Sequence, residues 1–382
     1  MEKIKIGDVC DILNGYAFKS ENYVDSGIRI IRISNVQKGY IEDSTPAFYS
    51  FDTMGLSKFM LEEGDLLMSL TGNVGRVAIL EKELLPAALN QRVACLRLKS
   101  NKITKSYLFH FLNSNFFEQQ CIMASNGVAQ KNMSTEWLKD YEIPLYTPNQ
   151  QEEIVTVLNA AQSILSSRRQ QLQKLDDLVK ARFVELFGDI NANDREWNVQ
   201  PLGELCTIVR GGSPRPIEKY LGCDIPWIKI GDATDGESIY LYSTKEHITQ
   251  AGVSKSRMVK SGSLIFANCG VSLGFARIIT FDGCIHDGWL AMENIDERLD
   301  KVFLLQSLNQ MTEHFRRIAP AGTQPNLNTA IMKDYKQIIP PLELQKEFIA
   351  FVAQTDKSKA AVQKALDEAQ MLFDSLMQKY FE

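Results

Sequence analysis

The segment from residue 154 to residue 186 reads IVTVLNAAQSILSSRRQQLQKLDDLVKARFVEL, and it decides the architecture of this chain. Apolar residues recur in it at alternating intervals of four and three residues, the heptad pattern of a coiled-coil helix. Residues 149–187 contain neither proline nor glycine, and the next glycine is Gly188. We therefore predict one long helix over 149–189. Its seam positions are Ile154, Leu158, Ala161, Leu165, Arg168, Leu172, Leu175, Val179, Arg182 and Leu186.

A second segment, residues 348–380, repeats the pattern as FIAFVAQTDKSKAAVQKALDEAQMLFDSLMQKY. Its seam positions are Phe348, Val352, Thr355, Lys359, Val362, Leu366, Ala369, Phe373, Leu376 and Tyr380. Helices of this length extend roughly 50–60 Å, too far to be covered by a domain of about 150 residues. We therefore expect a second helix over 343–382 that pairs with the first, the alternative being two single amphipathic helices, each packed on its own domain.

Polar residues interrupt the first seam at Arg168 and Arg182. A polar seam residue can fix the register of a helix pair at a cost in stability. A long cationic side chain can equally extend from the seam edge into solvent. The sequence leaves both interpretations open.

Outside the two helices, the chain contains the same module twice. Residues 5–15 correspond to 201–211, 31–35 to 228–232, 64–67 to 262–265 and 139–141 to 333–335. The four matches keep the same order and nearly the same offset, which is the sequence signature of an internal repeat.

Each module combines strands and helices. Short β-branched runs such as 28–33 and 77–80 alternate with Gly, Asn and Pro, which predicts strands and turns. Helical stretches are expected near 105–120 and 302–317. The predicted fold class is α+β: two similar mixed α/β domains, at 1–148 and 190–342, linked by the two long helices in a pseudo-twofold repeat.

Composition narrows the class of protein. The 382 residues are 45% hydrophobic and carry a formal net charge of −5, typical of globular domains rather than of disorder. Seven cysteines without a Cys-x-x-Cys pair favour reduced thiols over disulfides or zinc. No apolar run is long enough for a membrane span, and residues 1–8 do not resemble a secretory signal, so we expect a cytoplasmic protein.

Catalytic motifs are not found in the sequence. A phosphate-binding G-x-x-x-x-G-K-[ST] loop, a G-x-S-x-G elbow, an H-E-x-x-H helix and a kinase signature are all missing. The four histidines never fall at metal-ligand spacing. The sequence therefore predicts a two-headed binding protein with no catalytic residue, no bound metal and no cofactor.

Three short segments carry a resemblance to a known family. They are the helix end FVELFGD at 183–189 and the domain-to-helix joints PNQQEEI at 148–154 and PLELQKEF at 341–348. With the module openings and the duplicated order, they make the whole chain resemble the specificity subunits of type I restriction–modification systems.

The resemblance implies that each module is a target recognition domain that reads one half of a split, asymmetric double-stranded DNA site. It implies that the long helices form an antiparallel spacer that fixes the gap and docks methyltransferase subunits, two in number, and that a translocating restriction subunit completes the complex. It also implies that this chain holds neither S-adenosylmethionine nor ATP.

Base-reading residues are expected in three pairs of matched loops. Asn and Gln can bind adenine and Arg can bind guanine through paired hydrogen bonds, although Asn and Gly also build turns. The predicted DNA-binding residues of the first module are Thr71, Asn73, Arg76, Asn90, Gln91, Arg92, Gln130, Lys131 and Asn132. Those of the second are Asn268, Ser272, His286, Thr323, Gln324 and Asn326.

The charge balance fits this interpretation least well. Lys and Arg number 16 against 17 Asp and Glu in 1–148, and 16 against 18 in 188–342. Because phosphate affinity scales with basic contacts, we expect weak DNA binding by the chain alone. The alternative function is a coiled-coil scaffold whose two heads bind protein and do not bind DNA specifically.

Overall fold

The computed structural model describes residues 2–51, 55–125, 132–234, 239–270, 272–320 and 326–382. The chain divides into two compact units. Unit 1 comprises Met1–Gln170 and Gln363–Glu382, and unit 2 comprises Gln171–Val362. Each unit therefore contains one module together with a part of both long helices.

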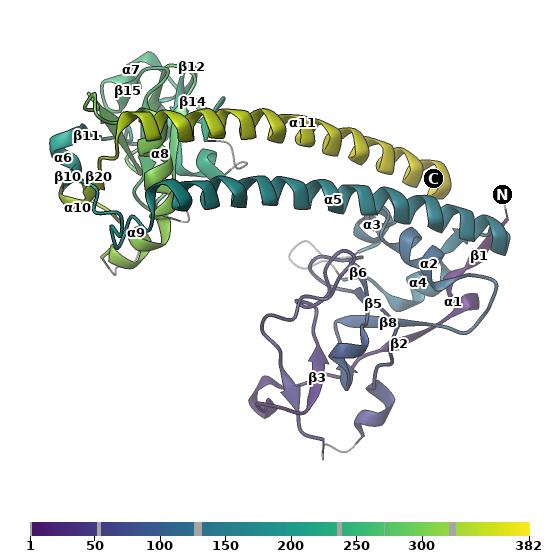
Figure 1. Ribbon diagram of the computed structural model, residues 1–382. Coiled ribbons are helices and arrows are strands. Elements are labelled where there is room, and N and C mark those ends of the chain that lie inside the picture. The colour runs from purple at the N-terminus through teal and green to yellow at the C-terminus, as the bar shows by residue number, and fades with distance from the viewer. Residues whose placement is uncertain (1, 52–54, 126–131, 235–238, 271, 321–325) are drawn as a thin grey trace. The chain divides into compact units, whose positions relative to one another are not determined.

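The two long helices are α5 (Pro148–Phe187) and α11 (Leu342–Phe381), each of 40 residues (Figure 1). All twenty predicted seam positions are buried or half-buried, and the coiled-coil prediction is confirmed. In the described part of the chain, no helix combines the length and the apolar character that crossing a membrane requires.

Within each unit the helices run antiparallel. In unit 1, Arg169 donates to Gln370 at 3.4 Å, and the Tyr146 hydroxyl just before α5 donates to the carbonyl of Tyr380 at 3.1 Å. In unit 2, Lys359 forms an ion pair with Asp176. Higher numbers on α5 thus face lower numbers on α11.

Two of the polar seam positions, Arg182 and Lys359, make contacts between the helices. Arg182 forms ion pairs with Glu347 of α11 and with Glu185 of its own helix. Lys359 likewise reaches Asp176 on the facing helix. Arg182 therefore bridges the helices rather than only extending into solvent, which favours the register interpretation for this position.

The module of unit 1 is built on a four-stranded antiparallel sheet of order β2-β8-β5-β6. A three-stranded sheet, β4-β3-β7, and a pair, β1-β9, accompany it. The strands are β1 (Lys3–Lys5), β2 (Cys10–Asn14), β3 (Ile28–Ile31), β4 (Phe48–Tyr49), β5 (Leu66–Ser69), β6 (Val77–Ile79), β7 (Ala87–Leu89), β8 (Val93–Leu98) and β9 (Glu142–Pro144). The short helices are α1 (Ile6–Val9), α2 (Lys105–Leu112), α3 (Asn115–Ala124) and α4 (Thr135–Asp140).

The module of unit 2 repeats this plan with the sheets β11-β19-β16-β17-β13, β14-β12-β18-β15 and β10-β20. Its strands are β10 (Val199–Pro201), β11 (Thr207–Arg210), β12 (Leu221–Ile228), β13 (Tyr240–Leu241), β14 (Glu246–Ile248), β15 (Arg257–Val259), β16 (Leu264–Ala267), β17 (Ala276–Ile279), β18 (Gly283–Ile285), β19 (Trp289–Glu293) and β20 (Lys336–Ile338). Its short helices are α6 (Leu202–Leu205), α7 (Gln250–Val253), α8 (Lys301–Gln310), α9 (Thr312–Ile318) and α10 (Thr329–Asp334).

The central strand of each module is buried on both faces. In β5, Leu66 and Met68 pack against the helical layer, while Leu67 packs toward the smaller sheet. In β16, Leu264 and Phe266 face the helices, and Ile265 faces the smaller sheet. Side chains alternate along a strand, so a run of four buried residues here connects two core layers.

The predicted helices at 105–120 and 302–317 are each broken in two. Thr104 caps the first piece and Ser114 caps the second in unit 1, because a serine or threonine oxygen satisfies free backbone N–H groups at a helix start. In unit 2 the break falls at Met311. The apolar periodicity predicted both helical regions and missed both breaks.

Candidate functional site

Three loops of unit 1 meet at the end of β5. The backbone N–H of Leu70 donates to the carbonyl of Arg92 at 3.0 Å, and that of Met133 donates to the carbonyl of Leu70 at 2.9 Å. Thr71 and Asn132 form an isolated antiparallel bridge. The residues that follow β5, the 90–92 turn and Asn132 are therefore neighbours in space.

Unit 2 repeats these contacts residue for residue. The N–H of Asn268 donates to the carbonyl of Gly288 at 2.9 Å, and the N–H of Leu327 donates to the carbonyl of Asn268 at 2.8 Å. Cys269 and Asn326 form the matching bridge. Both modules thus hold three loops together with the same backbone framework.

The turns at Asn90 and His286 are also built alike. Asn90 N–H donates to Ile31 at 3.2 Å, and His286 N–H donates to Ile228 at 3.0 Å. A glycine approaches each turn closely, since a Cβ on Gly15 or Gly211 would lie 2.2 Å from the carbonyl oxygen of Asn90 or His286, respectively. The Gly-rich opening of each module is therefore required by this close approach.

The predicted readers of unit 1 differ in exposure. The side chains of Asn73, Gln91, Arg92 and Asn132 are exposed, and those of Thr71, Arg76 and Asn90 are half-buried. Arg76 is held by a hydrogen bond to the side chain of Gln37. Gln130 and Lys131 lie outside the described residues.

In unit 2 the structure corrects two of the predicted positions. Asn268 and Ser272 are 0% exposed, so their side chains cannot reach a base edge from where they lie, and we remove them from the proposed readers. Asn268 occupies the place that Leu70 has in unit 1, inside the core layer rather than on the loop surface. His286 and Asn326 are half-buried, and Thr323 and Gln324 lie outside the described residues.

His286 is a neutral hydrogen-bonding group in its turn. Burial lowers its pKa, the nearby cations Lys229, Arg215 and Arg210 lower it further, and Asp287 opposes them. Nδ1 lies 3.0 Å from the backbone nitrogen of Gly288 and 2.9 Å from Oδ1 of Asp287. The Gly288 N–H favours the tautomer with its hydrogen on Nε2, and the Asp287 carboxylate favours the one with its hydrogen on Nδ1. Nε2 donates in the first tautomer and accepts in the second.

Two buried glutamines, which were not among the predicted site residues, join the modules to the long helices. Gln151 accepts from the N–H of Thr104 at 2.8 Å and donates to the carbonyls of Lys102 and Tyr146 at 2.8 and 2.9 Å. Gln345 makes the equivalent three bonds in unit 2. The signal was present in the sequence, because each glutamine lies within the joint segments quoted above.

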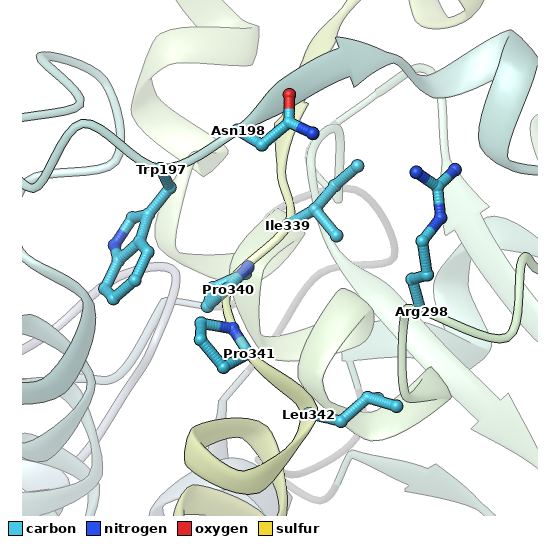
Figure 2. A pocket seen from close by; sticks show the side chains of 7 residues that line it. All are labelled: Trp197, Asn198, Arg298, Ile339, Pro340, Pro341 and Leu342. Carbon is cyan, nitrogen blue, oxygen red and sulfur yellow. The ribbon is translucent and has the colours of Figure 1, made fainter.

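An open pocket of about 420 Å³ lies next to the joint of unit 2. Figure 2 shows its lining, formed by Trp197, Asn198, Arg298, Ile339, Pro340, Pro341 and Leu342. These seven residues include no carboxylate, thiol or hydroxyl. Among the described residues, no group of three His, Cys, Asp or Glu side chains is placed to hold a metal ion.

Known proteins share both the sequence and the fold. A family model described as "Type I restriction modification DNA specificity domain" matches residues 1–176 and again 194–369. The MjaVIII specificity subunit of Methanocaldococcus jannaschii is 28% identical over 184 residues, which are 47% of this chain and 43% of that relative. The chain thus matches less than half the length of that relative.

Longer matches exist as well. The putative MjaX specificity subunit of the same organism is 24% identical over 369 residues, 90% of this chain and 83% of the relative. A solved structure from work on the assembly and conformational transition of the type I R-M system matches with a TM-score of 0.63 and 17% identity, covering 99% of this chain and 97% of that one. At that identity, the structural match supports the fold alone.

Proposed function

The chain belongs to the family of type I restriction modification DNA specificity domains, and on that premise we propose that it is the subunit that reads a bipartite, asymmetric double-stranded DNA site. One module would bind each half-site. The chain would dock methyltransferase subunits, two in number, and restriction subunits, and would itself neither methylate nor cut DNA. Its place of action would be the cytoplasm.

One observation carries the proposal. The same backbone hydrogen bonds hold three loops together in both modules, through Leu70 and Met133 in one and through Asn268 and Leu327 in the other. The loops themselves differ in sequence, for example Asn90-Gln91-Arg92 against His286-Asp287-Gly288. The two modules therefore share the backbone arrangement of these loops but differ in the side chains that the loops carry. This is expected of two domains that bind DNA in the same way and recognise different bases.

The proposed base readers are the predicted residues that remain accessible. Asn73, Gln91, Arg92 and Asn132 are exposed in unit 1, and their amides and guanidinium match adenine and guanine edges. The half-buried residues Thr71, Arg76, Asn90, His286 and Asn326 form the rest of the proposed set. In unit 2 the proposal therefore relies most on Nε2 of His286, which can form a hydrogen bond with a base edge as donor or as acceptor, according to the tautomer.

We propose that segments 1–148 and 190–342 each read one half-site. Segments 149–189 and 343–382 form the spacer helices between them. The test begins with the wild-type chain and a cognate methyltransferase subunit in one host, whose methylated sites are then sequenced. We expect methylation at two short specific sequences separated by a few base pairs of any sequence.

Exchanging residues 1–148 for the equivalent module of another family member should change one half-site and leave the other half-site and the gap unchanged. The reciprocal exchange of 190–342 is the matched control and should change only the other half-site. Inserting one heptad into both helices adds roughly 10 Å, about three base pairs, and should change only the gap. If either exchange altered both half-sites together, the two-reader proposal would fail.

The scaffold alternative is not favoured, because the family match covers both modules. Competition by duplex DNA separates the two functions. If the chain reads DNA, unlabelled cognate duplex should displace labelled cognate duplex from its complex with the methyltransferase at a far lower concentration than scrambled duplex does. If the chain is a scaffold, the two competitors should act alike.

A further inference from the structure

Four exposed cations gather along one edge of unit 2. They come from the end of β11, the loop that follows it and the start of β15, and we call them the basic edge: Arg210, Arg215, Lys255 and Arg257. Arg257 Nε donates to the carbonyl of Arg210 at 3.1 Å, which ties two of the segments together. In sequence they span nearly fifty residues of a module that is not basic overall.

The basic edge borders the proposed reading turn. Arg210 Nε donates to the backbone carbonyl of Asp287 at 2.9 Å. Ser256, between Lys255 and Arg257, donates to the carbonyl of Gly212 at 2.8 Å. Arg210 and Arg215 therefore lie close to the turn that carries His286, and Ser256 ties the segment of Lys255 and Arg257 to it through Gly212 and Ile285.

One carboxylate lies in the turn beside the basic edge, Asp287, which accepts from Ser213 at 2.8 Å and lies 2.9 Å from Nδ1 of His286. The bonds of Arg210 and Arg257 given above go to neutral backbone carbonyls. Lys255 lies over the ring of Tyr220, with Nζ 5.0 Å from the ring centroid. Among the described residues no carboxylate forms an ion pair with any of the four, whereas Lys229 close by is paired with Glu246 at 2.6 Å.

Unit 1 has different chemistry at the matching place. In unit 2, Met258 forms an antiparallel pair with Cys284, and in unit 1 Met60 forms the matching pair with Ala88. Met60 therefore corresponds to Met258, and the preceding residue, Phe59, corresponds to Arg257. There, Tyr16 packs on Phe59 with ring centroids 5.3 Å apart, and Tyr16 is 45% exposed. The position of Arg257 is therefore aromatic in unit 1, where the exposed lysines Lys19 and Lys58 lie near it in sequence.

We propose that the basic edge binds the DNA phosphates beside the second half-site and supplies part of the salt-dependent affinity. This inference rests on the proposed DNA-reading function and adds a phosphate-binding role for these four cations. Arg and Lys on a rigid edge bind phosphate oxygens and release condensed counterions. Because such contacts carry no sequence information, they position the turn without choosing the bases.

The test measures the affinity of the complete complex with its methyltransferase for a duplex that contains the methylated site, over 50–200 mM salt. The variant combines Arg210→Gln and Arg257→Gln. Each lost phosphate contact lowers the slope of log affinity against log salt by about 0.9, so we expect a loss of about 1.8. The ratio of cognate to scrambled affinity should stay the same.

Two controls accompany this variant. Lys333→Gln with Lys336→Gln removes the same charge from exposed residues of unit 2 and should leave the slope unchanged. Arg210→Lys with Arg257→Lys keeps the charge and should retain most of the slope. If the first variant does not assemble, Arg215→Gln with Lys255→Gln tests the same edge and should also lower the slope.

The outcomes distinguish the two proposals. A wild-type complex that does not prefer its cognate duplex overturns the proposed function. A wild-type complex with that preference, and variants of the basic edge with the wild-type slope, overturns the inference alone. Equal slope losses in the Lys333 and Lys336 control also overturn it, as does a loss of half-site preference without a change in slope.

Discussion

Replacing Gln345 by alanine should destabilise unit 2 more than its position near a helix end suggests. The side chain is 0% exposed. It accepts from the N–H of Asp300 and donates to the carbonyls of Arg298 and Pro340, each at 2.8 Å. These three bonds join the start of α11 to the loop that precedes α8 and to the end of the module.

The expected loss is about 3 kcal/mol, from three hydrogen bonds of about 1 kcal/mol each. A larger loss would follow if the three backbone groups were left dry, since an unsatisfied buried group costs about 1–3 kcal/mol. Arg298 and Pro340 line the open pocket of Figure 2, and we expect water from this pocket to solvate their carbonyls once the Gln345 side chain is removed. The lower figure therefore applies.

The assay is urea unfolding followed by tryptophan fluorescence. Trp197, Trp227 and Trp289 all belong to unit 2, so most of the signal reports this unit. Gln354→Ala is the control, because Gln354 is an exposed glutamine of the same helix, and it should change stability by about 0.5 kcal/mol or less. A loss below 1 kcal/mol for Gln345→Ala, or an equal loss for the control, would refute the reasoning.

Three further predictions concern the helices and the thiols. Leu165→Ala should lower the free energy of unfolding by about 2–5 kcal/mol, because Leu165 is 4% exposed. Ile164→Ala should lower it far less, because Ile164 is 49% exposed. Equal melting temperatures of the two variants would contradict the assignment of Leu165 to the seam. Burial raises the pKa of Asp356, so its ionised form opposes folding above that pKa, and Asp356→Asn should raise the melting temperature at pH 7 with the gain fading at acidic pH. When the native chain is treated with iodoacetamide at pH 8, exposed Cys223 should be labelled before buried Cys10. The thiolate is the reactive form, and burial raises the pKa of Cys10 to about 12. Mass spectrometry of the labelled peptides checks the order.

Much of the architecture could be predicted because its signals are local or repeated. The heptad spacing of 154–186 and 348–380 follows from the pitch of a single helix, and all twenty seam positions are buried or half-buried. The internal repeat predicted two modules of one kind, and the structure has matching sheets in both. The joint glutamines were visible in the quoted segments, although their bonds were not.

What the tertiary structure decided depends on which distant segments meet. Asn268 reads as a loop residue, yet strand pairing places it in the core position that Leu70 occupies in unit 1. Arg210 and Arg257 are far apart in a module without basic excess, and only the packing of β11 and β15 against the His286 turn brings them together. Helix periodicity depends on residues three and four positions apart, so the sequence alone reveals it. The burial of a polar side chain and the clustering of Arg and Lys side chains depend on contacts between segments that are far apart in the sequence.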